Sequence, residues 1–291
     1  MTESAQNTLV DAAQVSREAV VRRAPNGIRY AAFGDNRISD TELERIVQAI
    51  PASVAGALER KIYFFVPLAM SESRPDNRAD GHPAANEGGA ASVAPTLIAP
   101  IYTPELSDEA ICHRNVTLDG ELKGSDGVFI STRLLSDRFA LAFELFINVG
   151  HAFVDAAGIP ESFCELAWNQ ALADVRGETS HDAWEDRQAA LGGSLSGTSG
   201  RPSRDAGSPL RIDGKPQVNE KARTAFTESA FADALAIYLL SLAVDFDYSE
   251  LREREYPLLA PQALAERLRA VNKLFPPNSG YEFAIRYRRR A

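Results

Sequence analysis

The sequence predicts an α+β protein that is mainly helical and has few strands. Three observations predict this class. Long segments repeat apolar residues with the period of a helix, two short runs are rich in β-branched and aromatic residues, and two long segments rich in Gly, Ser and Pro separate the rest. The chain has 291 residues, 45% of them hydrophobic, which is enough to bury a sizeable core.

The first block of the chain predicts two helices and one strand. Apolar residues recur with helical spacing over 9–20. Ser39, followed three positions later by Glu42, has the form of a capping box and predicts the start of a second helix. The run Ile62–Val66 is β-branched and aromatic and predicts a buried strand.

The remaining blocks predict one short strand and three helices. Residues 127–131 have the composition of a strand, and the long apolar pattern from 134 to 157 is typical of a buried helix. Residues 220–244 predict a second long helix, and 261–274 predict a last, amphipathic one.

Two segments, 71–95 and 192–217, hold too few apolar groups to offset the entropy of ordering them, and they predict mobile loops. The organisation that follows is an N-terminal α/β region over 1–120 and a helical region over 121–291.

Composition restricts the partners and the compartment. The net charge of −9 argues against a nucleic-acid surface, and the longest apolar run, 234–244, is too short to span a bilayer. The first residues lack the pattern of a signal peptide, and Cys112 and Cys164 are too few for a disulfide framework. We therefore expect a soluble cytoplasmic protein whose partner is an unidentified small molecule or protein, with no nucleic-acid or membrane partner.

A narrow polar strip lies on the predicted helix 134–157. At 100° per residue, Glu144, Asn148, His151 and Asp155 fall on one side of a helix that is otherwise almost entirely apolar. Buried polar groups need partners. The strip therefore faces a cavity that holds a ligand or metal, or is satisfied by internal hydrogen bonds, or faces solvent. Glu144, Asn148 and Asp155 are the candidate ligand-binding residues.

Three segments of the chain resemble parts of the zincin metallopeptidases, namely 127–131, 143–155 and 226–234. The nearest type is the anthrax-lethal-factor-like group of the gluzincin branch. The resemblance covers about residues 125–245. It implies a zincin-like core with a small mixed sheet and long buried helices, in which 127–131 is the edge strand along the active-site cleft. It also implies that His151 is the second histidine of the zinc motif and that Glu228 is the third ligand.

The zinc motif of that family is broken in this chain. Two histidines one helical turn apart grip the metal, and the glutamate beside the first polarises the bound water. Ile147 stands where the first histidine belongs, and Asn148 stands where the catalytic glutamate belongs. No cofactor is therefore expected, although His151 and Glu228 remain as possible zinc ligands.

Three functional hypotheses follow. The chain is a metallopeptidase-like pseudoenzyme that binds a ligand or partner in the former cleft, or an enzyme that reuses the cleft, or a non-catalytic helical structural protein. The second hypothesis needs a rearranged metal site or an acid–base pair of His151 with a carboxylate, for which Glu228 is the candidate. The resemblance itself predicts that the helices 139–155 and 222–243 pack together. It also predicts that Glu228 is buried within direct or one-water reach of the His151 ring.

Overall fold

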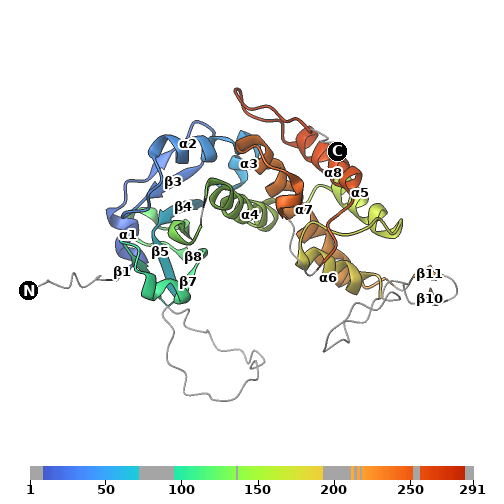
Figure 1. The fold of residues 1–291 in the computed structure, drawn as a ribbon, viewed down its shortest axis with the longest axis horizontal. Coiled ribbons are helices and arrows are strands. Elements are labelled where there is room, and N and C mark those ends of the chain that lie inside the picture. The colour runs from blue at the N-terminus through green and yellow to red at the C-terminus, as the bar shows by residue number, and fades with distance from the viewer. Residues whose placement is uncertain are drawn as a thin grey trace, which may run out of the picture. The chain divides into compact units, whose positions relative to one another are not determined.

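The computed structural model describes residues 9–71, 95–135, 137–192, 211–212, 215–216, 218–251 and 256–285, and it confirms an α+β protein (Figure 1). The chain divides into two compact units. The first, here called the sheet unit, consists of 1–44 and 59–141, and the second, the helical unit, consists of 45–58 and 142–291. The boundary predicted at residue 120 therefore lies inside the sheet unit.

The sheet unit contains two sheets. Its strands are β1 (Val10–Asp11), β2 (Arg22–Arg23), β3 (Arg29–Ala32), β4 (Lys61–Val66), β5 (Leu68–Ser71), β6 (Thr96–Ala99), β7 (Ala110–Ile111), β8 (His113–Thr117) and β9 (Asp126–Ser131). One sheet has the order β2-β3-β4-β9-β8 and the other the order β1-β6-β5-β7. In the five-stranded sheet, β3, β4 and β9 run parallel, and the two outer strands are antiparallel to them.

The two strands predicted from composition are the centre of the five-stranded sheet. β4 contains the predicted run, and its register pairs Phe64 with Phe129 of β9. The rings of these two residues stack with centroids 4.7 Å apart, and both side chains are fully buried. β9 confirms the strand predicted over 127–131, but it lies between β4 and β8 and is therefore not an edge strand. Its pairing with β4 is also the reason that the sheet unit extends past residue 120.

The structure contains each of the five predicted helices and three further helices that were not predicted, over 52–57, 161–172 and 181–190. They are α1 (Ala12–Glu18), α2 (Asp40–Gln48), α3 (Ala52–Ala57), α4 (Arg138–Ala157), α5 (Glu161–Leu172), α6 (His181–Ala190), α7 (Glu220–Ala243) and α8 (Pro261–Leu274), with short 3-10 turns η1 (Pro104–Glu109), η2 (Gly120–Leu122), η3 (Thr132–Leu134) and η4 (Tyr248–Leu251). The predicted cap of α2 is present, because the Glu42 amide donates to Ser39 Oγ at 3.2 Å.

The core of the helical unit forms around α7. Fifteen of its residues are buried, and α5, α6 and α8 pack against it (Figure 1). By length and composition, both α4 and α7 could cross a membrane. However, 50% of the most apolar window of α4 and 78% of that of α7 are buried inside the protein, as in the core helices of soluble folds.

The two predicted mobile loops, 71–95 and 192–217, lie for the most part outside the described residues. Within the second, the structure describes the antiparallel pair β10 (Arg211–Ile212) and β11 (Lys215–Pro216).

Candidate functional site

The polar strip on α4 divides into a buried half and an exposed half. Asn148 is buried, and its Nδ2 donates to the carbonyl oxygen of Glu144 at 2.8 Å and to Glu144 Oε1 at 3.1 Å. His151 and Asp155 are exposed. The buried half is thus satisfied by internal hydrogen bonds, and the other half faces solvent.

The expected packing of α4 against α7 is present at a close crossing. A Cβ atom added to Gly150 would lie 2.5 Å from the carbonyl oxygen of Ala232. Next to this point, the rings of Phe153 and Phe231 lie with centroids 5.9 Å apart. Glycine at 150 therefore allows the backbones of the two helices to approach closely.

The expected burial of Glu228 is wrong. Glu228 is exposed, and no hydrogen bond or ion pair joins it to His151, although the structure describes both residues. The buried carboxylate of α7 is Asp233, which is 5% exposed. The two acids are five residues apart, so they point about 140° away from each other around the helix axis. Burying Asp233 turns Glu228 towards solvent.

Asp233 is held by neighbouring polar groups. Thr179 Oγ1 donates to Asp233 Oδ2 at 2.8 Å. Burial raises the pKa of Asp233 to about 6, while hydrogen bonds from Ser180 and Thr179 and the charge of His151 oppose this rise. The carboxylate therefore carries an unfavourable charge at neutral pH.

This charge predicts a pH-dependent gain in stability from Asp233→Asn. A folded-state pKa above the ordinary value of 3.8 means that the folded protein binds the extra proton, so stability falls as pH rises through the window from about 4 to 6. We expect Asp233→Asn to raise the free energy of unfolding at pH 8 by about 1–3 kcal/mol, and the gain to vanish near pH 4. Urea unfolding of both proteins between pH 4 and pH 8 measures this. A variant that is less stable than the parent at pH 8 contradicts it.

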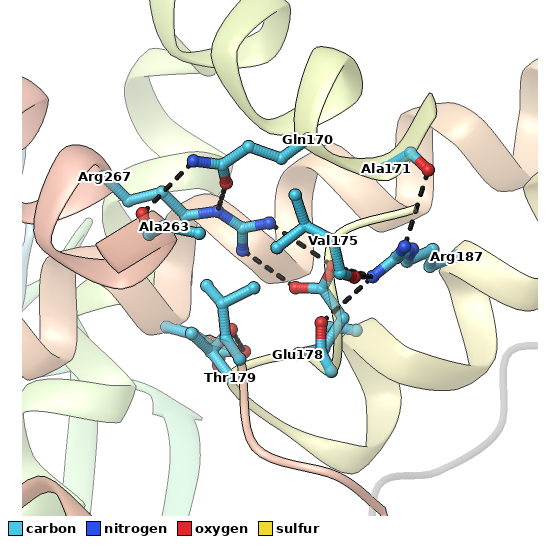
Figure 2. Close-up of polar contacts among 12 residues, drawn as sticks. Gln170, Ala171, Val175, Glu178, Thr179, Arg187, Ala263 and Arg267 are labelled. Carbon is cyan, nitrogen blue, oxygen red and sulfur yellow. Dashed lines mark hydrogen bonds and ion pairs between the residues drawn. The ribbon is translucent and has the colours of Figure 1, made fainter. Parts of the chain in front are cut away.

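The helical unit also buries a second acid, Glu178, between two arginines. Arg267 donates to both carboxylate oxygens, at 2.8 and 3.3 Å, and Arg187 donates to Oε1 at 3.3 Å. Figure 2 shows the two guanidinium groups reaching the carboxylate from different helices, α8 and α6. All three side chains are at most 2% exposed.

Most of the remaining polar atoms of this network also have protein partners, although the buried Arg187 Nε makes no hydrogen bond to the described residues. Arg267 Nε donates to Gln170 Oε1 at 2.8 Å, and Arg187 Nη1 donates to the carbonyl oxygens of Val175 and Gly177 at 2.7 and 3.0 Å. Such groups have little capacity left for a ligand, so the network joins α5, α6 and α8 and is structural.

The sheet unit contains a pocket of about 370 Å³ at the carboxyl ends of its parallel strands. We call it the carboxyl-edge pocket. Its lining residues follow β3 and β9 in the chain: Asn36, Arg37, Ile38, Glu42, Thr132, Arg133, Leu135, Asp137, Arg138 and Leu141. Ligands of open α/β sheets bind at this edge, because the loops that leave the strands there carry polar side chains and helix N-termini.

Buried hydrogen bonds fix the loops of this pocket to the strand ends. Asn36 Nδ2 donates to the Phe65 carbonyl oxygen at 3.3 Å, and Asn36 Oδ1 accepts from the Ile38 amide at 3.2 Å. Thr132 Oγ1 lies 3.1 Å from the Val66 carbonyl oxygen and 3.3 Å from that of Asn36. The pocket is thus built on rigid backbone before any ligand arrives.

Arg37 has an unusual backbone conformation within this frame. Its φ is 57°, and among the described residues only Asp174 shares a positive φ without being glycine. A left-handed conformation costs an L-residue about 1–2 kcal/mol, so it persists only where the surrounding structure enforces it. Such strain is common at ligand sites.

Some charged side chains of the pocket have an oppositely charged partner, and others do not. Arg133 Nη2 lies 2.6 Å from Asp35 Oδ2, and Arg138 Nε lies 3.6 Å from Glu42 Oε1. Asp137 Oδ1 accepts from the Ala140 amide and caps α4. The Arg37 side chain is exposed and has no hydrogen-bond or ion-pair partner among the described residues.

The possible zinc ligands do not fit a metal. His151 and Glu228 are both exposed, and no hydrogen bond or ion pair joins them. Across the described ranges, no group of three or more His, Cys, Asp and Glu side chains is arranged to hold a metal ion.

Comparisons of the chain with models of protein families, with curated proteins and with solved structures find no significant match. The site must therefore be judged on its own geometry.

Sequence reasoning missed the residues of the carboxyl-edge pocket. The signal that could have found them is the polar run Gly34–Arg37 directly after β3, but β3 is short and contains two alanines, so no strand was predicted there. The residues of the buried network left no signal, because charged residues are rarely buried and Glu178 and Arg267 are 89 positions apart.

Proposed function

We propose that this chain is a ligand-binding protein without peptidase activity and that its ligand occupies the carboxyl-edge pocket. The observation that carries the proposal is the pocket itself, about 370 Å³ in volume, at the carboxyl ends of β3 and β9. Pockets that bind small metabolites have volumes from about 300 Å³ upward. The resemblance to metallopeptidases supports only the lack of peptidase activity, because the motif lacks a first histidine and a catalytic glutamate.

Two further features support ligand binding at this pocket. The wall residues Asn36 and Thr132 are buried and hydrogen-bonded, which gives the site a fixed shape. The lining also combines three apolar side chains, Ile38, Leu135 and Leu141, with five charged and two neutral polar ones. In a small-molecule site, apolar side chains supply contact area and polar groups set the orientation of the ligand.

The test of binding is a methyl NMR spectrum of the full chain, recorded with a set of neutral, anionic and cationic aromatic fragments. We expect some fragments to shift the methyl signals of Ile38, Leu135 and Leu141, and we expect Ile38→Trp, which fills the pocket, to remove those shifts. The matched control is Ile101→Trp, because Ile101 is 52% exposed and does not line the pocket. If no fragment shifts these methyl signals, the proposal is wrong.

Peptide hydrolysis tests the other half of the proposal. We expect no cleavage of casein with added zinc, and none after the double change Ile147→His and Asn148→Glu. The restored helix motif still lacks its third ligand, because Glu228 points to solvent. A fluorescent casein assay with and without chelator measures this. Chelator-sensitive cleavage that is lost on His151→Ala would overturn the proposal.

A further inference from the structure

Arg37 points to the chemical class of the ligand. The pocket contains three arginines and two carboxylates, on a chain whose net charge is −9. Two of the arginines are already paired, Arg133 with Asp35 and Arg138 with Glu42. Arg37 has no hydrogen-bond or ion-pair partner among the described residues, so it is the arginine of this pocket whose charge is left to meet a ligand.

The guanidinium of Arg37 is suited to an anion that presents two oxygen atoms side by side. It presents N–H donors in a fixed fork that matches a carboxylate or a phosphate. Because the strained backbone of Arg37 is held by the Asn36 turn, the side chain starts from a fixed point beside the pocket. Pre-organisation of this kind lowers the entropy that binding has to overcome.

Three apolar side chains also line the pocket. Ile38 and Leu135 are partly exposed, whereas Leu141 is 6% exposed. Side chains of this kind bind a ligand by excluding water from an apolar surface. Both carboxylates in the lining have a partner, because Glu42 Oε1 lies 3.6 Å from Arg138 Nε and Asp137 Oδ1 accepts from the Ala140 amide.

We propose that the carboxyl-edge pocket binds a small amphiphilic anion, whose single carboxylate or phosphate group contacts Arg37 and whose apolar body packs on Ile38, Leu135 and Leu141. This inference rests on the proposed function, since it names the ligand class of the same pocket. Arg37 then determines the preference for a negatively charged ligand, and the three apolar side chains provide the contact area.

The experiment compares probes of one shape and different charge on the full chain, by methyl NMR titration. Benzoate and phenyl phosphate carry the anion, benzamide is neutral, benzylamine is cationic, and acetate has the anion without the ring. We expect benzoate or phenyl phosphate to bind at least tenfold more tightly than benzamide, benzylamine or acetate. The stronger of the two distinguishes a carboxylate ligand from a phosphate ligand.

Variants at Arg37 test the role of its side chain. We expect Arg37→Gln to weaken the anionic probe at least tenfold and to leave benzamide unchanged, whereas Arg37→Lys has an intermediate effect because it keeps the charge and loses the fork. Arg17→Gln is the matched control, since Arg17 is exposed on α1 and lies outside the pocket. An unchanged backbone spectrum shows that the variants are folded.

The outcomes separate the two proposals. If benzamide or benzylamine shifts the pocket methyl signals as strongly as benzoate, or if Arg37→Gln has no effect, the inference of an anionic ligand is overturned while ligand binding at the pocket stands. If no probe shifts these methyl signals, both proposals fall.

Discussion

Replacing Glu178 by alanine is expected to lower the free energy of unfolding of the helical unit by about 3–5 kcal/mol. The carboxylate is fully buried. Its removal leaves the buried Arg267 guanidinium without its counter-charge, and it leaves Arg187 with only the exposed Asp174, whose Oδ1 lies 3.7 Å from Nη2. The cost of an uncompensated buried charge exceeds the cost of losing the hydrogen bonds alone. Chemical denaturation followed by circular dichroism measures the change.

Two comparisons isolate the cause of this effect. Glu220→Ala removes an exposed ion pair with Arg223 and is expected to cost less than about 1 kcal/mol. The triple change Glu178→Leu, Arg187→Met and Arg267→Met replaces the whole network by apolar groups and is expected to recover most of the loss. If Glu178→Ala is as mild as Glu220→Ala, the buried network does not hold the helical unit together.

Replacing Gly177 by alanine is expected to cost about 2–5 kcal/mol. The φ of Gly177 is +79°, and a Cβ atom there would lie 2.1 Å from the carbonyl oxygen of Leu258. The close approach is needed for two backbone hydrogen bonds. The Glu178 amide donates to the Pro257 carbonyl oxygen at 3.0 Å, and the Leu259 amide donates to the Glu178 carbonyl oxygen at 2.9 Å. An alanine at 177 therefore pays the conformational cost of a positive φ, and its Cβ atom also collides with the backbone of Leu258.

Gly158 provides the matched control for this prediction. Its φ is +72°, but a Cβ atom there would meet nothing within 4 Å. Gly158→Ala is therefore expected to show the conformational cost alone, about 1–2 kcal/mol. Thermal unfolding of both variants gives the comparison. Equal losses at the two positions would mean that the segment around Leu258 yields to the added methyl group.

The elements of the fold could be predicted from the sequence where one local signal was strong. The β-branched and aromatic run of β4, the capping box of α2 and the apolar period of α7 and α8 each act over a few residues. Which strands pair is decided by contacts distant in sequence, and so the parallel order β3-β4-β9 was not predicted and the predicted boundary at residue 120 lies inside the sheet unit.

The candidate site was harder to predict, for a physical reason that Glu228 and Asp233 illustrate. Both acids lie on the same apolar helix, so a sequence motif alone can assign either of them to the position of a metal ligand. Only the packing of α7 against α6 and its neighbours decides which face is buried, and it buries Asp233 beside Thr179. The pocket around Arg37 likewise depends on two loops that are about 100 residues apart in the chain and meet at one edge of a sheet.

The position of a bound anion tests the central proposal most directly. A crystal structure of the full chain with benzoate would give it. We expect the carboxylate within hydrogen-bond distance of the Arg37 guanidinium and the ring against Leu135 and Leu141, at the carboxyl ends of β3 and β9. Benzoate bound instead beside His151 on α4, with the carboxyl-edge pocket empty, would contradict the proposal.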